Sequence, residues 1–371
     1  MVLFLRSSVW FGNYVISGEL LRNPLWVKIF LLKMSKYYWK ETMSHKPIKT
    51  RYKNFTLPLF IILFVMSAIS GCKGFGHLTR VEMAYPKASF CEDCHGEVYH
   101  EWADSPHARA FTGNTFRMAT HDYSFTDCLG CHAPEPTLSA AQAECRTVSR
   151  DEGVTCASCH LEESKMVGPL TPTGILAPHP VRVDDGRYRN SQFCGRCHEG
   201  TFKEWSDVKA ENKHTCQDCH MPPVKRRITQ SDKLISKMIV ATEEVTAQKK
   251  HTFGVYRELP DVEPFHVTVN RDGELFTVVL ENNVPHALPT GDFGVRVVTV
   301  DISAVQANDE VVPIKRLELI KGLHTAIPPK CSASWSFSLP GTVKTVRCVI
   351  SRSRVNSDER EELYQTEVPV I

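Results

Sequence analysis

The sequence predicts an α+β protein, in which a mostly helical and loop domain is followed by an antiparallel β-sandwich domain. Five copies of the pattern Cys-x-x-Cys-His lie within residues 91–220. From Pro264 onward, short runs with strand character alternate with turn signals. An apolar run at residues 55–70 precedes both regions and predicts export. We therefore expect an upstream extension and signal peptide over 1–71, a tether over 72–88, the motif domain over 89–225, a connector over 226–260 and the β-sandwich over 261–371.

The five motifs carry the strongest chemical signal in the chain. Two thiols three positions apart can add to the two vinyl groups of one haem, and the adjacent histidine then lies beneath the iron. Zinc sites and thioredoxin-like redox pairs share Cys-x-x-Cys. With 16 histidines in 371 residues, however, the chance that all five copies carry the histidine is roughly 10⁻⁷. The sequence therefore predicts five covalently bound c-type haems. The attachment residues are Cys91, Cys94, Cys128, Cys131, Cys156, Cys159, Cys194, Cys197, Cys216 and Cys219, and the proximal ligands are His95, His132, His160, His198 and His220.

The motif region is short for the number of haems it is predicted to hold. Residues 91–220 leave about 26 residues for each haem. We expect the haems to supply most of the buried apolar surface, with short helices and loops around them, and the haem-free chain to be largely unfolded. Close attachment sites should also bring the porphyrins near one another, which provides a path for electrons.

An internal repeat links the first and fourth motifs. A tryptophan follows the motif histidine by seven residues in both cases, at Trp102 and Trp205, and each is preceded by a glutamate. Such an aromatic side chain is expected to pack against a haem edge or in an ordinary core. The match indicates duplication of a two- or three-haem unit.

Within residues 88–225, five segments in or beside the motifs carry a family signal: 99–111, 128–134, 152–156, 193–195 and 216–222. They resemble multihaem c-type cytochromes, in particular the superfamily of the tetrahaem electron carrier that serves hydroxylamine oxidation. The resemblance implies two histidine ligands on most haem irons and electron transfer as the usual role. The fifth motif departs from the tetrahaem pattern, so the arrangement of the haems cannot be carried over.

Sixth ligands must come from histidines outside the motifs. His107 matches the Ser-x-His-Ala ligand of the resembling family, His251 begins a segment similar to one that ends such domains, and His286 lies in a loop like one in related cytochromes. His121 and His179 are candidates from their positions between motifs. His100 and His214 are reserves. For each of these histidines the alternative is a surface or propionate-bonding role.

Charge and leader composition indicate location and partners. Residues 1–71 carry ten Lys/Arg and two acidic residues, which leaves 34 basic and 40 acidic residues in the rest. This net acidic body argues against nucleic acid and suits other redox proteins or cytochromes as partners.

The sequence Ile69-Ser-Gly-Cys72 resembles a bacterial lipobox, which implies a lipid anchor at Cys72 in the cell envelope, at the periplasmic face or the outer membrane. Cleaved secretion and a retained membrane helix are the alternatives. Met34 and Met43 are candidate start positions.

The carboxy-terminal region carries no catalytic constellation. Strands are expected at 265–270, 275–281, 295–305, 311–319, 332–339 and 343–351, with an Asp272-Gly273 hairpin turn. Cys331 and Cys348 are candidates for a disulfide, and Cys145 is left over. The basic triplet Lys225-Arg-Arg227 is expected to be a solvated face, or alternatively a docking site for an acidic partner or a propionate.

Three functions fit these features. The first is an electron-transfer relay, since iron held by two histidines cannot bind substrate. The second is an enzyme acting on a small nitrogen or sulfur compound at one haem with an open axial site. All five motifs end in histidine, whereas the pentahaem nitrite reductases characteristically have lysine in the catalytic motif, which favours the relay. The third is a conducting filament in which subunits exchange a histidine ligand.

Overall fold

The protein forms two compact units, Met1–Cys72 and Lys73–Ile371. The computed structural model describes residues 9–11, 14–16, 85–136, 143–174, 179–210, 213–231, 237, 240–254, 262–291, 296–338, 343–353 and 360–370. In the first unit, β1 (Val9–Phe11) and β2 (Tyr14–Ile16) pair antiparallel. The predicted signal peptide, Cys72 and most of the tether lie outside the described residues. None of the helices that are described is long and apolar enough to cross a bilayer.

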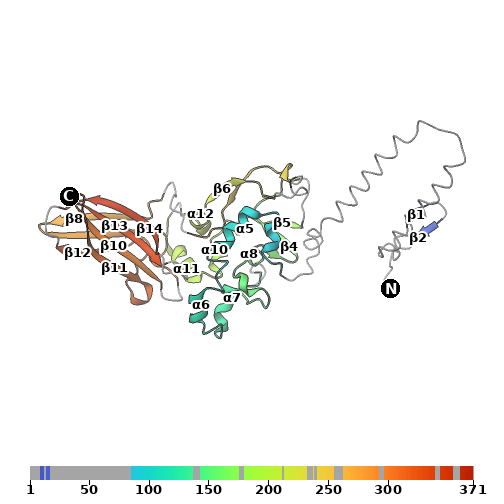
Figure 1. Cartoon of the computed structure of the whole chain (residues 1–371), viewed down its shortest axis with the longest axis horizontal. Coiled ribbons are helices and arrows are strands. Elements are labelled where there is room, and N and C mark those ends of the chain that lie inside the picture. Colours follow the sequence, from blue (N-terminus) through green and yellow to red (C-terminus); the bar gives the residue numbers. More distant parts are fainter. Residues whose placement is uncertain are drawn as a thin grey trace. The chain divides into compact units, whose positions relative to one another are not determined.

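The motif region of the second unit consists of short helices, small sheets and loops (Figure 1). Its longest described helix, α11, has nine residues. The α-helices are α4 (Ser89–Glu92), α5 (Gly96–Ala103), α6 (Asn114–Ala119), α7 (Leu129–His132), α8 (Cys156–His160), α9 (Asp185–Tyr188), α10 (Gln192–Gly195), α11 (Glu199–Asp207) and α12 (Cys216–His220). Of two 3₁₀ helices, η3 (Thr126–Cys128) ends at the first cysteine of the second motif and η4 (Arg150–Glu152) precedes the third motif. The strands β3 (Leu161–Glu162), β4 (Lys165–Gly168) and β5 (Val181–Val183) form one small sheet, and β6 (Pro223–Arg226) pairs with β7 (Thr246–Lys249) in another.

The motif helices begin in two ways, and both are readable in the sequence. At α8 and α12 the residue before the first cysteine is a threonine, Thr155 or Thr215, whose side chain caps the helix in a reciprocal box with Ser158 or Asp218. At the first and fourth motifs the cysteines lie in or next to a short helix, and a longer helix, α5 or α11, starts directly after the motif histidine. The five motifs therefore include two pairs with matching local structure.

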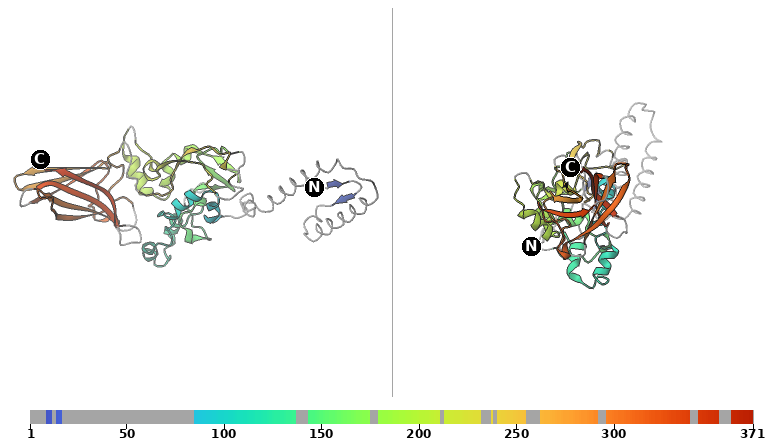
Figure 2. Two further views of the ribbon diagram at one scale, coloured as in Figure 1. Left: turned by 45° about the horizontal axis from the view of Figure 1, so that its top comes forward. Right: turned by 90° about the vertical axis from the view of Figure 1, so that its left-hand side faces the viewer.

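The carboxy-terminal region contains two antiparallel sheets, as the views in Figure 2 show. One has the strand order β11-β10-β13-β14 and the other β12-β9-β8. The strands are β8 (Phe265–Asp272), β9 (Leu275–Asn282), β10 (Val297–Gln306), β11 (Val311–Ile320), β12 (Ser332–Ser338), β13 (Val343–Ser353) and β14 (Arg360–Pro369). The mixed α+β class is confirmed. Strand β14 was not predicted, because its sequence is rich in glutamate and it pairs with β13 at the edge of its sheet.

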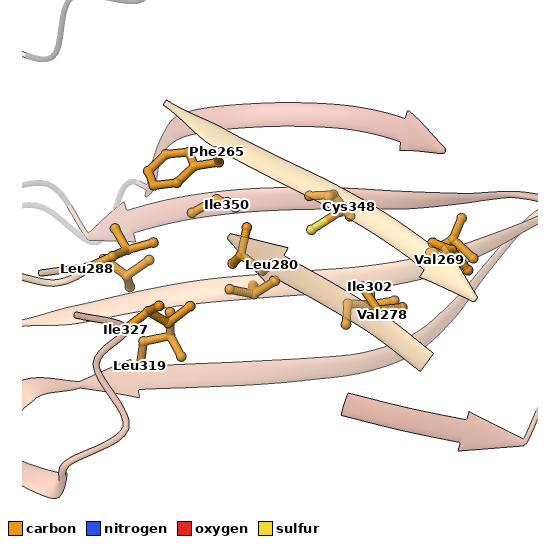
Figure 3. Packing of buried hydrophobic residues seen from close by; sticks show 14 of the residues in the cluster. Phe265, Val269, Val278, Leu280, Leu288, Ile302, Leu319, Ile327, Cys348 and Ile350 are labelled. Carbon is orange, nitrogen blue, oxygen red and sulfur yellow. The ribbon is translucent and has the colours of Figure 1, made fainter. Parts of the chain in front are cut away.

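One hydrophobic core joins the two sheets (Figure 3). Alternate residues of each strand point into it, which is the period-two pattern of a half-buried sheet. From the three-stranded sheet come Phe265, Val267, Val269, Phe276, Val278 and Leu280; from the four-stranded sheet come Val298, Val300, Ile302, Leu319, Val346, Cys348 and Ile350; Leu288 and Ile327 complete it. The buried apolar cluster described in the motif region contains only Tyr85, Ala157 and Leu161.

The predicted connector folds back onto the first motif. The backbone N–H of Gln230 donates to the Cys94 carbonyl at 2.7 Å. Arg226, expected in a solvated basic triplet, is instead buried, and its guanidinium forms a bidentate ion pair with Glu101 at 2.7 and 3.0 Å. The expectation of a solvated face was therefore wrong for Arg226, because a carboxylate in α5 supplies the counter-charge that makes burial tolerable.

Candidate haem sites

We number the candidate sites 1 to 5 in the chain order of their motifs. In four of them a backbone carbonyl holds the motif histidine. The Nδ1 atoms of His95, His132, His160 and His220 lie 2.9, 2.6, 2.7 and 2.9 Å from the carbonyl oxygens of Ile228, Ala110, Val167 and Gly254. With Nδ1 donating to a carbonyl, Nε2 of the neutral ring is the acceptor that a metal requires.

Four motif histidines face a second histidine from a distant part of the chain. The ring centroids of His95 and His179 are 6.4 Å apart and those of His198 and His107 are 6.2 Å apart. His160 and His251 are separated by 6.2 Å, and His220 and His286 by 6.4 Å. Sites 1, 3, 4 and 5 are therefore each flanked by two imidazoles, and all four partners are among the histidines proposed as sixth ligands.

These separations fit one iron between each pair of rings. A metal–imidazole bond of about 2 Å, with the ring centre about 1.1 Å beyond the nitrogen, gives two centroids on opposite sides of an ion a separation of about 6.3 Å. The residues present therefore fit the haem that the motifs imply. The cysteines of each motif would hold the macrocycle and the two histidines would hold its iron.

Burial keeps these imidazoles in the form that binds metal. It lowers the pKa of His107 and of His251 to about 3. The pKa of His95, His160, His220, His179 and His286 is lowered as well, with burial as the main cause in each case. A neutral imidazole is the ligand form, so the environment favours coordination at neutral pH.

Site 2 has a different environment. The ring stacked against His132 is that of Phe116, with centroids 3.7 Å apart and planes 5° apart. His121, proposed as a sixth ligand, is exposed, and its ring lies 5.4 Å from that of Phe125. His121 and the two following residues all have positive φ, between 47° and 65°, which is an unusual backbone for residues with a side chain. Among the described residues, no ring contact joins His132 to a second histidine.

Thiols of different sites touch one another and reveal which sites are neighbours. The side chains of Cys91 and Cys156, of Cys131 and Cys197, and of Cys194 and Cys216 lie close enough to interact with each other. Haem attachment would convert the thiols to thioethers, so the feature that carries over is proximity. Sites 1 and 3, sites 2 and 4, and sites 4 and 5 are therefore adjacent.

An aromatic side chain connects sites 3 and 4. The ring of Phe253 lies 4.3 Å from that of His107 and 5.7 Å from that of His251. His107 faces the motif histidine of site 4, and His251 faces that of site 3. Phe253 therefore contacts the second, or outer, histidine of both sites. Together with the thiol contacts, it joins all five sites in one continuous set.

The two tryptophans of the sequence repeat make equivalent contacts. Trp102 Nε1 donates to the carbonyl of Val154 at 2.7 Å, and Trp205 Nε1 donates to that of His214 at 2.9 Å. Val154 and His214 each precede the threonine that caps the following motif helix. Both tryptophans therefore tie an α5-type helix to a capped motif.

The remaining predicted residues have no comparable arrangement. His100 packs against Tyr99 with ring centroids 5.6 Å apart, and the His214 carbonyl accepts the Trp205 hydrogen bond. Cys331 and Cys348 are not bonded: Cys348 is buried in the sheet core, whereas Cys331 is exposed. The disulfide suggested by the sequence is therefore not formed.

Comparisons with known proteins find similarity in part of the motif region and in the fold. Residues 90–161 match the family described as cytochrome c554 and c-prime. This match spans the first three of the five motifs. In fold, the chain is similar to the penta-heme cytochrome c552 from Thermochromatium tepidum, with a TM-score of 0.50 and 16% identity over 76% of this chain and 98% of that one. A superoxide reductase from Nanoarchaeum equitans matches at a TM-score of 0.18 and 14% identity over 28% of this chain and 89% of that one. No curated protein matches the sequence.

Proposed function

We propose that the protein is an exported pentahaem c-type cytochrome that relays electrons, with four of its five irons each held by two histidines. The observation that carries the proposal is the set of four histidine pairs with ring centroids 6.2 to 6.4 Å apart. Bound haem supplies one-electron redox chemistry, and an iron with two histidine ligands has no position left for a substrate.

The contacts between sites support a path for electrons. The thiol contacts relate site 1 to site 3, site 2 to site 4 and site 4 to site 5, and Phe253 lies between the outer histidines of sites 3 and 4. Electrons would therefore pass along 1-3-4-5, with site 2 branching from site 4. The two carboxy-terminal sheets form a β-sandwich, and a loop of this region contributes His286 to site 5. Other redox proteins are the proposed partners.

Electron paramagnetic resonance of the holoprotein tests this proposal. We expect four low-spin irons in every chain of five haems and at most one high-spin iron. Two or more high-spin irons would overturn the assignment of the histidine pairs.

A second candidate function is reduction or oxidation of a small nitrogen or sulfur compound at site 2. It is favoured by the environment of His132, whose ring stacks on Phe116, while His121 lies against Phe125. Burial is the main cause that lowers the pKa of His132 and of His198, and the charge of Arg296 lowers both further, so a cation lies near this site. Carbon monoxide should then bind one reduced iron in five. If carbon monoxide binds none of the five irons, the second candidate function is excluded and electron transfer remains.

We also propose that the chain is exported and anchored by lipid at Cys72. The proposal rests on the basic stretch before the apolar run 55–70 and on the lipobox-like ending at Cys72. The mass of the mature amino-terminal peptide tests it. We expect a lipid-modified Cys72, and an unmodified residue there would contradict the anchor.

A further inference from the structure

The repeat that places Trp102 and Trp205 also places two glutamates. Glu101 lies six residues after His95, and Glu204 lies six residues after His198. Both stand near the carboxy-terminal end of the helix that starts directly after the motif histidine, α5 or α11. The relay itself assigns no role to either residue.

Glu101 holds the backbone of the histidine that faces site 3. Its Oε2 accepts a hydrogen bond from the His251 backbone N–H at 2.9 Å. The same carboxylate accepts two hydrogen bonds from Arg226, at 2.7 and 3.0 Å. Only 17% of the Glu101 side chain and 5% of the Arg226 side chain are exposed, so the charge-assisted bonds are largely shielded from water. Arg226 thereby fixes the carboxylate with one oxygen directed at the His251 amide.

Glu204 makes the equivalent contacts at site 5. Its Oε2 accepts from the Ala287 backbone N–H at 2.9 Å and from the Thr290 hydroxyl at 2.6 Å. The other oxygen pairs with Lys321 Nζ at 2.6 Å, and 19% of the Glu204 side chain is exposed. Ala287 follows His286 directly. The carboxylate therefore holds the chain next to the histidine that faces His220, again with a cation on its second oxygen.

We infer that Glu101 and Glu204 are equivalent positioning residues, each of which fixes the segment carrying the outer histidine of a neighbouring haem. This inference rests on the proposed assignment of His251 and His286 as ligands. An imidazole must stay within a few tenths of an ångström of its bonding position, and holding the adjacent peptide restricts its movement. The cation on each carboxylate restricts the carboxylate in turn.

The same two carboxylates define two-haem units. Helix α5 begins directly after His95, the motif histidine of site 1. Through Glu101 it holds His251, the second histidine of site 3. Helix α11 begins directly after His198, the motif histidine of site 4. Through Glu204 it holds the chain next to His286, the second histidine of site 5. The thiol contacts Cys91–Cys156 and Cys194–Cys216 join the same pairs of sites. The duplicated unit is therefore sites 1 and 3, matched by sites 4 and 5, with site 2 outside both.

The test uses the holoprotein with Glu101→Ala and Glu204→Ala. Each variant should convert a fraction of one iron in five from low-spin to high-spin, measured by electron paramagnetic resonance, and should allow added carbon monoxide to bind that iron when reduced. Added imidazole should restore the low-spin signal, which a general loss of structure would not permit. Glu101→Gln, whose amide oxygen can still accept from the backbone, should retain more low-spin iron than Glu101→Ala.

A matched control lies on α11. Glu199→Ala removes an exposed carboxylate near the start of this helix and should leave the spectrum unchanged. Glu101→Asp keeps the charge but moves the carboxylate oxygen away from the His251 amide, so its high-spin fraction should lie between those of the wild type and Glu101→Ala. It also serves as the test if Glu101→Ala fails to accumulate. Wild-type spectra from Glu101→Ala and Glu101→Asp would overturn the inference.

Histidine variants separate this inference from the proposed function. His251→Ala and His286→Ala should each remove the sixth ligand from one iron and make that iron fully high-spin. If they leave all low-spin signals intact, the ligand assignment fails. If the histidine variants each convert one iron to high-spin and the glutamate variants convert none, only the positioning role fails.

Discussion

The two regions of the second unit stabilise their folds by different means. The carboxy-terminal sheets share a core of 15 buried residues, whereas the described motif region has a buried apolar cluster of three. The motif region instead uses helix caps, hydrogen bonds from histidine rings to carbonyls, and a buried polar group. In that group, Arg146 donates to Tyr85 and to the carbonyls of Pro134, Val148 and Ser149. Apolar burial is the main driving force for folding. We therefore expect the motif region to depend on the haems that its motifs imply, whereas the sheets carry their own core.

The largest expected effect comes from withholding haem. The full chain produced without haem attachment should lose the structure of residues 85–254 and keep that of residues 262–370, because only the sheets have an apolar core of their own. Limited proteolysis followed by mass spectrometry would reveal a resistant carboxy-terminal fragment. Equal resistance of both regions would contradict the comparison.

A substitution in the sheet core should act on the sheets alone. Phe276 has no exposed surface, so Phe276→Ala should lower the free energy of unfolding of this region by about 3–5 kcal/mol through lost burial and a cavity. The haem spectrum should not change. Denaturant unfolding monitored by circular dichroism and by haem absorption would separate the two responses.

The neighbouring residue provides the control. Leu275 is 46% exposed, and Leu275→Ala should have a much smaller effect on the same transition. A loss for Leu275→Ala as large as that for Phe276→Ala would argue against a specific core.

A polar substitution should act on the motif region. Arg226→Ala leaves the Glu101 carboxylate largely buried without its counter-charge and should cost about 3 kcal/mol of folding free energy there. The exposed pair Lys203–Asp207 offers the contrast, since Lys203→Ala should cost about 0.5 kcal/mol or less. Similar midpoints of denaturation for the two variants would contradict the buried role of Arg226.

The smallest effect is expected at His121. His121→Ala should leave every low-spin signal in place because the exposed His121 ring lies against Phe125. His107→Ala should convert one iron to high-spin, since its ring faces His198 at 6.2 Å. Electron paramagnetic resonance of the two variants at equal haem content measures the difference. A lost low-spin signal in His121→Ala would assign this residue to site 2.

The sequence was sufficient for features that depend on neighbouring residues. The motifs, the capping threonines and most strands follow local patterns, and the mixed α+β class could be predicted from them. The Glu-Trp pairs of the repeat were visible, but their partners were not. Glu101 meets His251, and Glu204 meets Ala287, only through contacts 150 and 83 residues apart in the chain. The burial of Arg226 depends on such a contact too, so the local charge pattern suggested the wrong environment.

The histidine pairs show the same limit. Composition and resemblance supplied the candidates, but no spacing rule relates His95 to His179 or His160 to His251. Their association depends on how the small sheets place loops over the motifs. His121 illustrates the converse, since its position between motifs made it a candidate although its ring faces Phe125.

The central claim is that ten cysteines hold five haems, around which the motif region folds. Intact-mass measurement of the purified protein, combined with haem quantification, tests it most directly. We predict a mass increase of five haems per chain, with the ten motif cysteines unreactive toward thiol reagents. A chain that carries zinc or reactive motif thiols in place of covalently attached haem would contradict it.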